Sequence, residues 1–202
     1  MTILALDTSN KTLSVAVELT DGTIIEQTIE NTLQHSVLLM PTIEAVFKEA
    51  GITAKDLTKV IVAEGPGSYT GLRIGVTVAK TLAKSLGIPL VGVSSLDVFL
   101  PDLASKVEVG ELVVPFFDAR RGNIFAVGYQ KTDEGFEKVI PEQHSSWDDF
   151  LKSLPEQSNG VTFVGQLQSI TKEAIVEKGA SEAKWLEASD AIPHATSLIE
   201  LG

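Results

Sequence analysis

The chain has 202 residues, 44% of them hydrophobic, which is enough to bury one sizeable core or two small lobes and excludes an intrinsically disordered protein. It contains no cysteine, so disulfides, thiolate metal sites and a cysteine nucleophile are excluded as well. Its net charge of −11 argues against a protein that grips RNA by itself, because Lys and Arg contacts dominate affinity for phosphate backbones. Any RNA that it serves is expected to be held by a basic partner.

The N-terminus predicts a strand rather than a signal peptide, because it has no basic segment and reaches Asp7 after only a few residues. No apolar run approaches the roughly 20 residues that a membrane-spanning helix requires. We therefore expect a cytoplasmic protein without a membrane partner.

The first half of the sequence alternates strands and helices. Three antiparallel strands come first, with Asp21-Gly22 as a hairpin dipeptide, and the next helix ends at Gly51, a residue type that suits a left-handed C-cap. Pro41 lies inside that helix and predicts a kink. The expected strands are Ile3–Leu6, Leu13–Glu18, Thr23–Ile29, Lys59–Ala63 and Ile88–Val93; the expected helices are Gln34–Ala50, one from Ser68 or Thr70 to Gly87, and a short one at Ser95–Leu103.

The second half begins after a polar stretch at Ser105–Gly110 and again opens with consecutive strands. We therefore expect two duplicated lobes, residues 1–105 and residues 106–202. The element order predicts an α/β fold whose sheet has a hairpin at one side and parallel crossovers at the other. The elements expected in the second lobe are strands at Leu112–Asp118, Asn123–Tyr129, Gly135–Val139 and Val161–Val164, and helices at Ser169–Lys178 and from about Ala195.

The most specific string is Gly65–Gly75, GPGSYTGLRIG, at a strand-to-helix turn. Its glycines can present amides and a helix N-terminus to an anion, but the spacing matches neither a Walker A loop nor the dinucleotide fingerprint. The alternative is close packing of the helix on the sheet or on a partner helix. We favour packing or an interface, because Gly71, Gly75 and Ala79 recur four residues apart on one helix face.

Two polar motifs that follow strands are candidates for a ligand cleft. Asp7, Thr8 and Ser9 end the first strand, and Asp118 and Arg120 end the strand that opens the second half. In actin-like phosphotransferases an aspartate at the end of the first strand coordinates metal. We favour the alternative that Asp7 satisfies turn amides, because one carboxylate is weak evidence of catalysis. Asp118 and Arg120 can bind a ligand between the lobes or form a structural ion pair.

The histidines predict no metal site. His35 opens the first long helix, but Leu38 and Leu39 stand one turn later, where a second ligand would be needed. His144 and His194 lie far away in the sequence, and there is neither a Ser-His-Asp context nor a G-x-S-x-G elbow. We expect no catalytic residue, no metal and no cofactor.

Three strings, LALDTS, GPGSYTGLRIG and DARRGNIFAVGY, together resemble the bacterial TsaB (YeaZ) family over essentially the whole chain. The resemblance implies the two-lobed, ribonuclease H-like fold that actin, sugar kinases and the heat-shock chaperone ATPases share. It also implies a non-catalytic scaffold that activates TsaD, the related enzyme that transfers a threonylcarbamoyl group to the adenosine beside the anticodon of tRNAs reading codons that start with A. The resemblance further implies that the ATPase TsaE joins the assembly and that the chain forms a homodimer when alone. tRNA is expected to contact the chain only through the complex. Whether a nucleotide binds at the junction with TsaD is left open.

The resemblance places the interface with TsaD, or with a second copy, on the two long helices of the N-terminal lobe. TsaD holds its metal with an HxxxH pair, whereas here His35 is followed by Leu39, so the ligands are expected to be lost. Family members continue past residue 202, so a C-terminal truncation is expected. The expected interface residues are His35, Leu38, Leu39, Val46, Tyr69, Thr70, Gly71, Leu72, Arg73, Gly75, Val76 and Ala79.

Two enzymes remain as alternatives. An actin-like ATPase or kinase would use Asp7 as its metal carboxylate, but the second half has no Asp-Gly-Gly phosphate loop. A peptidase is less favoured, because the sequence offers neither a metal pair nor a nucleophile arrangement.

Overall fold

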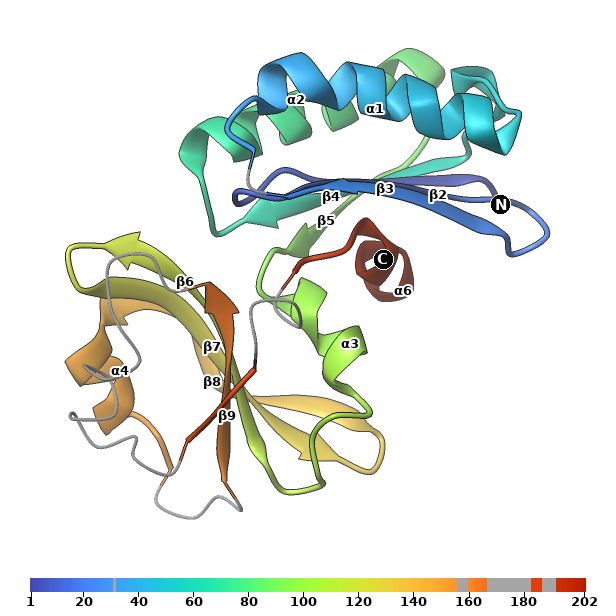
Figure 1. The fold of residues 1–202 in the computed structure, drawn as a ribbon. Helices are drawn as coiled ribbons and strands as arrows, with labels where there is room; N and C mark the ends of the chain where they lie inside the picture. The colour runs from blue at the N-terminus through green and yellow to red at the C-terminus, as the bar shows by residue number, and fades with distance from the viewer. Residues whose placement is uncertain (31, 156–159, 167–182, 187–191) are drawn as a thin grey trace. The chain divides into compact units, whose positions relative to one another are not determined.

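The computed structural model describes residues 1–30, 32–155, 160–166, 183–186 and 192–202 (Figure 1). The chain forms two compact units: unit 1 comprises residues 1–98 and 193–202, and unit 2 comprises residues 99–192. The lobes expected at 1–105 and 106–202 stay a prediction for the protein's domains. By contact, residues 193–202 belong with unit 1, because the last helix packs on the sheet of that unit.

Unit 1 is built on a mixed five-stranded sheet in the order β3-β2-β1-β4-β5. β1, β2 and β3 are antiparallel neighbours, whereas β4 runs parallel to β1 and β5 parallel to β4. The expected hairpin at one side and parallel crossovers at the other are therefore confirmed. The strands are β1 (Ile3–Asp7), β2 (Leu13–Glu18), β3 (Ile24–Ile29), β4 (Lys59–Gly65) and β5 (Leu90–Ser94).

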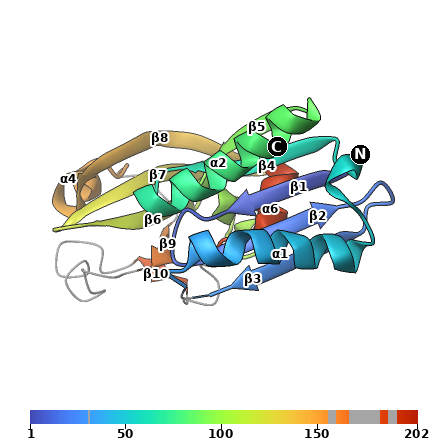
Figure 2. The same cartoon turned by 90° about the horizontal axis from the view of Figure 1, so that it is seen from above.

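Helices α1 (His35–Ala50) and α2 (Tyr69–Leu86) cover one face of this sheet, and α6 (Ala195–Leu201) covers the other (Figures 1 and 2). The alternation of side chains along a strand explains the two layers. In β1, Leu4 and Leu6 enter the core beneath α1 and α2, whereas Ile3 and Ala5 enter the core beneath α6. Each long helix ends at a glycine with φ of 67°, at Gly51 and Gly87, as a left-handed C-cap requires.

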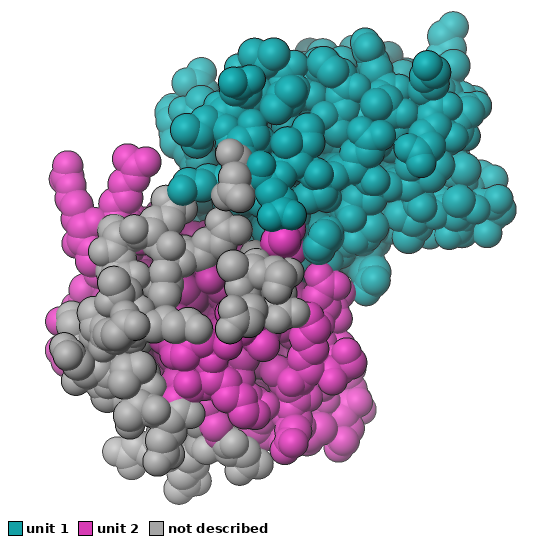
Figure 3. Space-filling view, viewed as in Figure 1, with its two compact units in different colours: residues 1–98, 193–202 teal, residues 99–192 magenta. Residues whose placement is uncertain are grey.

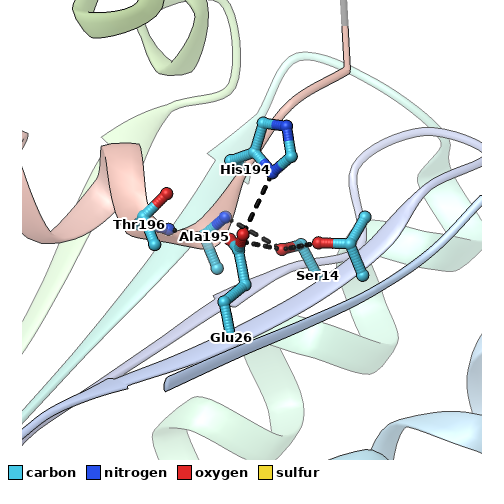
Figure 4. Close-up of polar contacts among 6 residues, drawn as sticks. Ser14, Glu26, His194, Ala195 and Thr196 are labelled. Carbon is cyan, nitrogen blue, oxygen red and sulfur yellow. Dashed lines mark hydrogen bonds and ion pairs between the residues drawn. The ribbon is translucent and has the colours of Figure 1, made fainter. Parts of the chain in front are cut away.

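A polar network anchors the start of α6 on β2 and β3 (Figure 4). Ser14 Oγ accepts a 2.9 Å hydrogen bond from the Ala195 N–H, and Glu26 Oε1 accepts a 3.1 Å bond from the Thr196 N–H. His194 Nδ1 lies 3.0 Å from Glu26 Oε2. Because the first amides of a helix have no intrahelical acceptor, these strand side chains act as caps supplied from the sheet.

Unit 2, which is magenta in Figure 3, is built on a second five-stranded sheet in the order β10-β9-β6-β7-β8. The strands β6, β7 and β8 are antiparallel, while β9 is parallel to β6 and β10 to β9. The helix expected at Ser169–Lys178 lies outside the described residues. The elements are α3 (Leu100–Leu103), β6 (Leu112–Arg120), β7 (Asn123–Thr132), β8 (Gly135–Ser146), α4 (Trp147–Lys152), β9 (Val161–Gln166) and β10 (Lys184–Trp185), with short 3-10 turns at Ala54–Asp56 in unit 1 and at Asp97–Phe99.

Two features of unit 2 differ from the sequence-based expectation. β8 continues past Val139, because it is an edge strand and an edge position tolerates Pro141. The polar stretch after it forms α4, which Ser146 caps by accepting from the Asp149 N–H, and Trp147 is buried against Phe163 with ring centroids 5.6 Å apart.

Candidate functional site

The β1–β2 loop is fixed to the start of α2 by hydrogen bonds. Asp7 Oδ1 accepts a 2.7 Å bond from the Ser9 N–H, which turns the chain at the end of β1. Thr8 Oγ1 then donates a 2.8 Å bond to the Gly71 carbonyl oxygen. The Ser68 N–H donates a 2.6 Å bond to the Ser9 carbonyl oxygen, and Ser68 itself caps α2. Three of the expected ligand-cleft residues therefore hold the helix that carries the expected interface.

The glycines of GPGSYTGLRIG create the space for this loop. A Cβ on Gly67 would overlap the Ser9 carbonyl oxygen, one on Gly71 the Thr8 carbonyl oxygen and one on Gly75 the Thr8 hydroxyl, each closer than real Cβ atoms approach. Ala79 continues the same buried face. The small-residue stripe thus packs against the chain's own β1–β2 loop and sheet, which is the sheet-packing alternative that the sequence had left open beside a partner helix.

Asp7 is a buried carboxylate. Its side chain is 1% exposed, and Oδ2 has no hydrogen-bond partner among the residues that the structure describes. Burial raises the pKa of this carboxyl to about 6, against the opposing effect of the hydrogen bonds from Ser9. The hydrogen bond from the Ser9 N–H to Asp7 Oδ1 supports the turn-forming interpretation of Asp7.

The expected interface residues divide into inward and outward sets. Inside unit 1, His35 lies 3.4 Å through Nε2 from the Thr12 carbonyl oxygen. Tyr69 is 74% exposed, and the guanidinium carbon of Arg73 lies 5.4 Å from the centre of its ring. The residues buried within unit 1 are His35, Leu39, Val46, Gly71, Gly75 and Ala79. Those that are partly buried are Leu38, Leu72 and Val76, and those that are exposed are Tyr69, Thr70 and Arg73.

Three exposed apolar side chains near this surface were not identified from the sequence. Leu33 is 84% exposed, Val37 65% and Met40 44%. Val37 and Met40 are three residues apart and so share one face of α1. Val37 lies on the opposite side of the helix from the buried Leu39, and a helical projection of Gln34–Ala50 into inner and outer faces would have found this exposed position.

Asp118 and Arg120 lie in unit 2, at the β6–β7 turn, and they interact through the backbone. Asp118 Oδ1 accepts a 2.7 Å hydrogen bond from the Arg120 N–H, so this pair shapes the turn. The turn also contains two non-glycine residues with positive φ, Arg120 at 68° and Arg121 at 53°. Neither arginine side chain has a salt bridge or hydrogen bond among the described residues.

Within the described part of the chain, no three His, Asp or Glu side chains gather as metal ligands. No helix there has the length and apolar character needed to cross a bilayer.

Comparisons with known proteins agree on one family. Residues 23–202 match the family described as TsaD, tRNA N6-adenosine threonylcarbamoyltransferase. The chain is 40% identical to the tRNA threonylcarbamoyladenosine biosynthesis protein TsaB of Bacillus subtilis, over all of this chain and 87% of that protein. Its structure resembles YeaZ from Pseudomonas aeruginosa, with a TM-score of 0.80 at 27% identity over 99% of this chain and 89% of that one. A protein with an actin-like ATPase fold from Bacteroides thetaiotaomicron, with a TM-score of 0.51 at 9% identity over 98% and 95%, shares the fold alone.

Proposed function

We propose, since the chain belongs to the TsaB (YeaZ) family, that it is a non-catalytic scaffold subunit that binds and activates TsaD in the formation of N6-threonylcarbamoyladenosine in tRNA. The B. subtilis relative is named for the biosynthesis of this nucleoside, which supports the pathway. The observation that carries the scaffold role is the apolar outer face of α1 and α2 in unit 1. TsaE is proposed as a further member of the assembly.

The docking face, which we define as Val37, Met40, Tyr69, Arg73 and Val76, lies on the N-terminal halves of both helices. α1 and α2 both return against the direction of β1, so they run parallel to each other and begin at the same edge of the sheet. Both helices lie on the same face of the sheet, and they contact one another (Figure 2). Side chains from two helices therefore form one continuous surface.

This docking face has the composition of a protein interface. Val37 and Tyr69 are more than half exposed although both are apolar or aromatic, while their helices bury Leu39 and Ala79 fully on the inner side. Tyrosine and arginine are enriched among the residues that dominate binding energy, and here Arg73 lies over the Tyr69 ring. Apolar side chains that are exposed to water often mark an interaction surface, where a partner covers them.

The same docking face accounts for the proposed homodimer. TsaD is related to this chain, so the complex with TsaD would be a pseudo-symmetric pair of similar lobes, and the homodimer a symmetric pair of identical lobes. Both pairs can therefore use the same docking face. TsaD and a second copy are then mutually exclusive partners. tRNA enters through the complex rather than through this acidic chain alone.

Reconstitution tests the proposal directly. tRNA threonylcarbamoylation is measured with TsaD, TsaE, a threonylcarbamoyl donor and tRNA, with and without this chain. The scaffold role predicts that modification requires the chain and that Asp7→Asn, which keeps the turn acceptor Oδ1, supports it normally. Modification that proceeds equally well without the chain would overturn the proposal.

The rival function is an actin-like ATPase or kinase that uses Asp7. The observation in its favour is the buried Asp7 Oδ2, which has no partner among the described residues. The scaffold is favoured, because a single carboxylate is a weak cation site, and no group of three His, Asp or Glu side chains gathers as metal ligands among the described residues. ATP turnover by the purified chain that Asp7→Asn abolishes would reverse this ranking.

A further inference from the structure

The β6–β7 turn in unit 2 carries two of the three arginines of the whole chain, side by side. Basic residues are outnumbered here, since Lys and Arg together number 16 against 27 Asp and Glu. Both Arg120 and Arg121 are exposed, and among the described residues neither guanidinium has an ion-pair or hydrogen-bond partner. The Asp118 carboxylate in the same turn binds the Arg120 N–H rather than a guanidinium, so both arginine side chains are available for an external anion.

The backbone of this turn is unfavourable for arginine. Arg120, Arg121 and Gly122 have φ of 68°, 53° and 77°, so all three occupy the left-handed region that favours glycine or asparagine. Turn chemistry would be better served by Asn or Gly at the first two positions. Residues held in such a conformation are a reason to look for a role of the side chain beyond the fold.

The turn is also held in place. The Asp118 carboxylate accepts from the Arg120 N–H at 2.7 Å, and the Gly122 carbonyl oxygen accepts from the Trp147 N–H at 3.2 Å. A register shift between Asp118 and Arg120 adds a bulge at the same point. Both guanidinium groups are therefore presented from a fixed backbone, which lowers the entropy lost when they bind.

We infer that Arg120 and Arg121 form a phosphate-binding element, and that its ligand is the backbone of the RNA handled by the complex. Guanidinium groups bind phosphate oxygens bidentately, which suits them to this ligand. An exposed hairpin tip reaches the backbone of a macromolecule, whereas a small nucleotide is usually enclosed in a concave site. The inference rests on the proposed function, because the tRNA of that complex supplies the phosphates.

This contact supplements the hold of a basic partner on the RNA. With a net charge of −11, the isolated chain is predicted not to bind tRNA measurably, and the two arginines act only when the complex brings the RNA to them. Each phosphate contact contributes about 0.9 to the slope of log affinity against log salt concentration. Two contacts therefore predict a change of about 2 in that slope.

The test measures the affinity of the reconstituted complex for fluorescently labelled tRNA between 50 and 300 mM salt, roughly the range in which phosphate contacts weaken. The variant Arg120→Gln/Arg121→Gln should lose about tenfold in affinity, and its salt slope should be shallower by about 2. The matched control Lys55→Gln/Lys152→Gln removes the same charge from two exposed positions and should leave the slope unchanged. Arg120→Lys/Arg121→Lys should retain most of the slope.

A folding defect is separated by a second variant, Arg120→Gly/Arg121→Gly. Glycine relieves the left-handed backbone, so this variant should unfold no earlier than the parent and still lose RNA affinity. The fluorescence of Trp147 and Trp185, which both lie in unit 2, reports that unfolding. Unchanged affinity and slope in the Gln variant would overturn the inference.

The failure of the proposed function is visible in the same experiment. Co-elution of the chain with TsaD is checked first, and a chain that does not co-elute overturns both proposals. A complex that forms normally but binds tRNA equally well with the Gln variant overturns only the RNA contact. An ATP titration distinguishes the other phosphate source: loss of nucleotide binding with unchanged tRNA affinity would overturn the assignment to RNA.

Discussion

The Thr8 hydroxyl donates a 2.8 Å hydrogen bond to the Gly71 carbonyl oxygen and so ties the β1–β2 loop to the first turn of α2. Gly71 and Gly75 leave room for Thr8, and α2 carries the exposed Tyr69 and Arg73 on its outer side. The glycine-rich motif therefore sets the position of the docking face from within the protomer.

Alanine at Gly75 is predicted to destabilise unit 1 through Thr8. The added Cβ would overlap the Thr8 hydroxyl while standing in ordinary contact, at 3.5 Å, with the Thr8 Cβ. We expect Gly75→Ala to lower the free energy of unfolding by about 1–3 kcal/mol. Chemical denaturation followed by circular dichroism measures it, with Thr77→Ala on the exposed face of α2 as the control.

Thr8→Ala should rescue Gly75→Ala and should not rescue Gly71→Ala. The Cβ on Gly75 meets a side-chain oxygen that Thr8→Ala removes, whereas the Cβ on Gly71 meets the Thr8 carbonyl oxygen, which every residue retains. A double-mutant cycle should give a favourable coupling of about 1 kcal/mol for the first pair and little for the second. Equal coupling in both pairs would contradict the packing described.

Asp7→Asn is predicted to stabilise the protein above pH 6. Burial raises the pKa of Asp7 from 3.8 to about 6, so the folded state binds more protons than the unfolded state between these values. Stability contributed by this group therefore falls as the pH rises through that window. At pH 8 the variant should gain up to about 3 kcal/mol over the parent, and at pH 4 the difference should be small. A difference independent of pH would show that the Asp7 carboxyl is not desolvated.

Ser14→Ala should loosen the start of α6. It leaves the Ala195 N–H without its 2.9 Å acceptor, and the loss should lower the free energy of unfolding by about 1 kcal/mol. Ser85→Ala, at an exposed position of α2, is the matched control. Hydrogen exchange of the Ala195 amide should be faster in the Ser14 variant, and unchanged protection there would argue against the capping role.

Acid should release the same anchor through Glu26. Burial alone would raise the pKa of this carboxyl, but the hydrogen bonds from His194, the Thr196 N–H and Ser14, with the charge on His194, lower it overall. A depressed folded pKa contributes stability above the unfolded value of 4.5, which is lost as the pH falls through the folded value. Glu26→Gln should thus have a lower free energy of unfolding than the parent at pH 7. This difference should disappear at acid pH, where Glu26 of the parent is protonated. A deficit that persists at low pH would contradict the ion-pair contribution.

Local signals in the sequence were sufficient for most of unit 1. Asp21-Gly22 indicated the β2–β3 hairpin, and Gly51 marked the end of α1 with the left-handed backbone that it has in the structure. β8 was predicted too short, because Pro141 normally ends a strand and its edge position became visible only once the sheet order was known.

The site was harder to predict, because its contacts join residues that are distant in sequence. Gly71 and Gly75 lack a Cβ and so leave room for Thr8, which precedes them by more than sixty residues. A stripe of small residues indicates close approach but does not identify what approaches. Gly71, Gly75 and Ala79 were therefore expected at a partner interface, whereas in the structure they pack within unit 1. The anchor between Ser14 and Ala195 has no sequence signal at all, since Ser14 alternates within an ordinary strand.

Titration of TsaD with the fluorescently labelled chain tests the central claim most directly. Val37→Ser/Tyr69→Ser removes the two most exposed apolar groups of the docking face, and Val109→Ser/Val139→Ser removes two exposed valines from unit 2 as the matched control. The account predicts that the first pair weakens TsaD binding at least tenfold, or by about 1.4 kcal/mol, while the control pair binds like the parent. Parental affinity in the first pair, or an equal loss in the control, would contradict it.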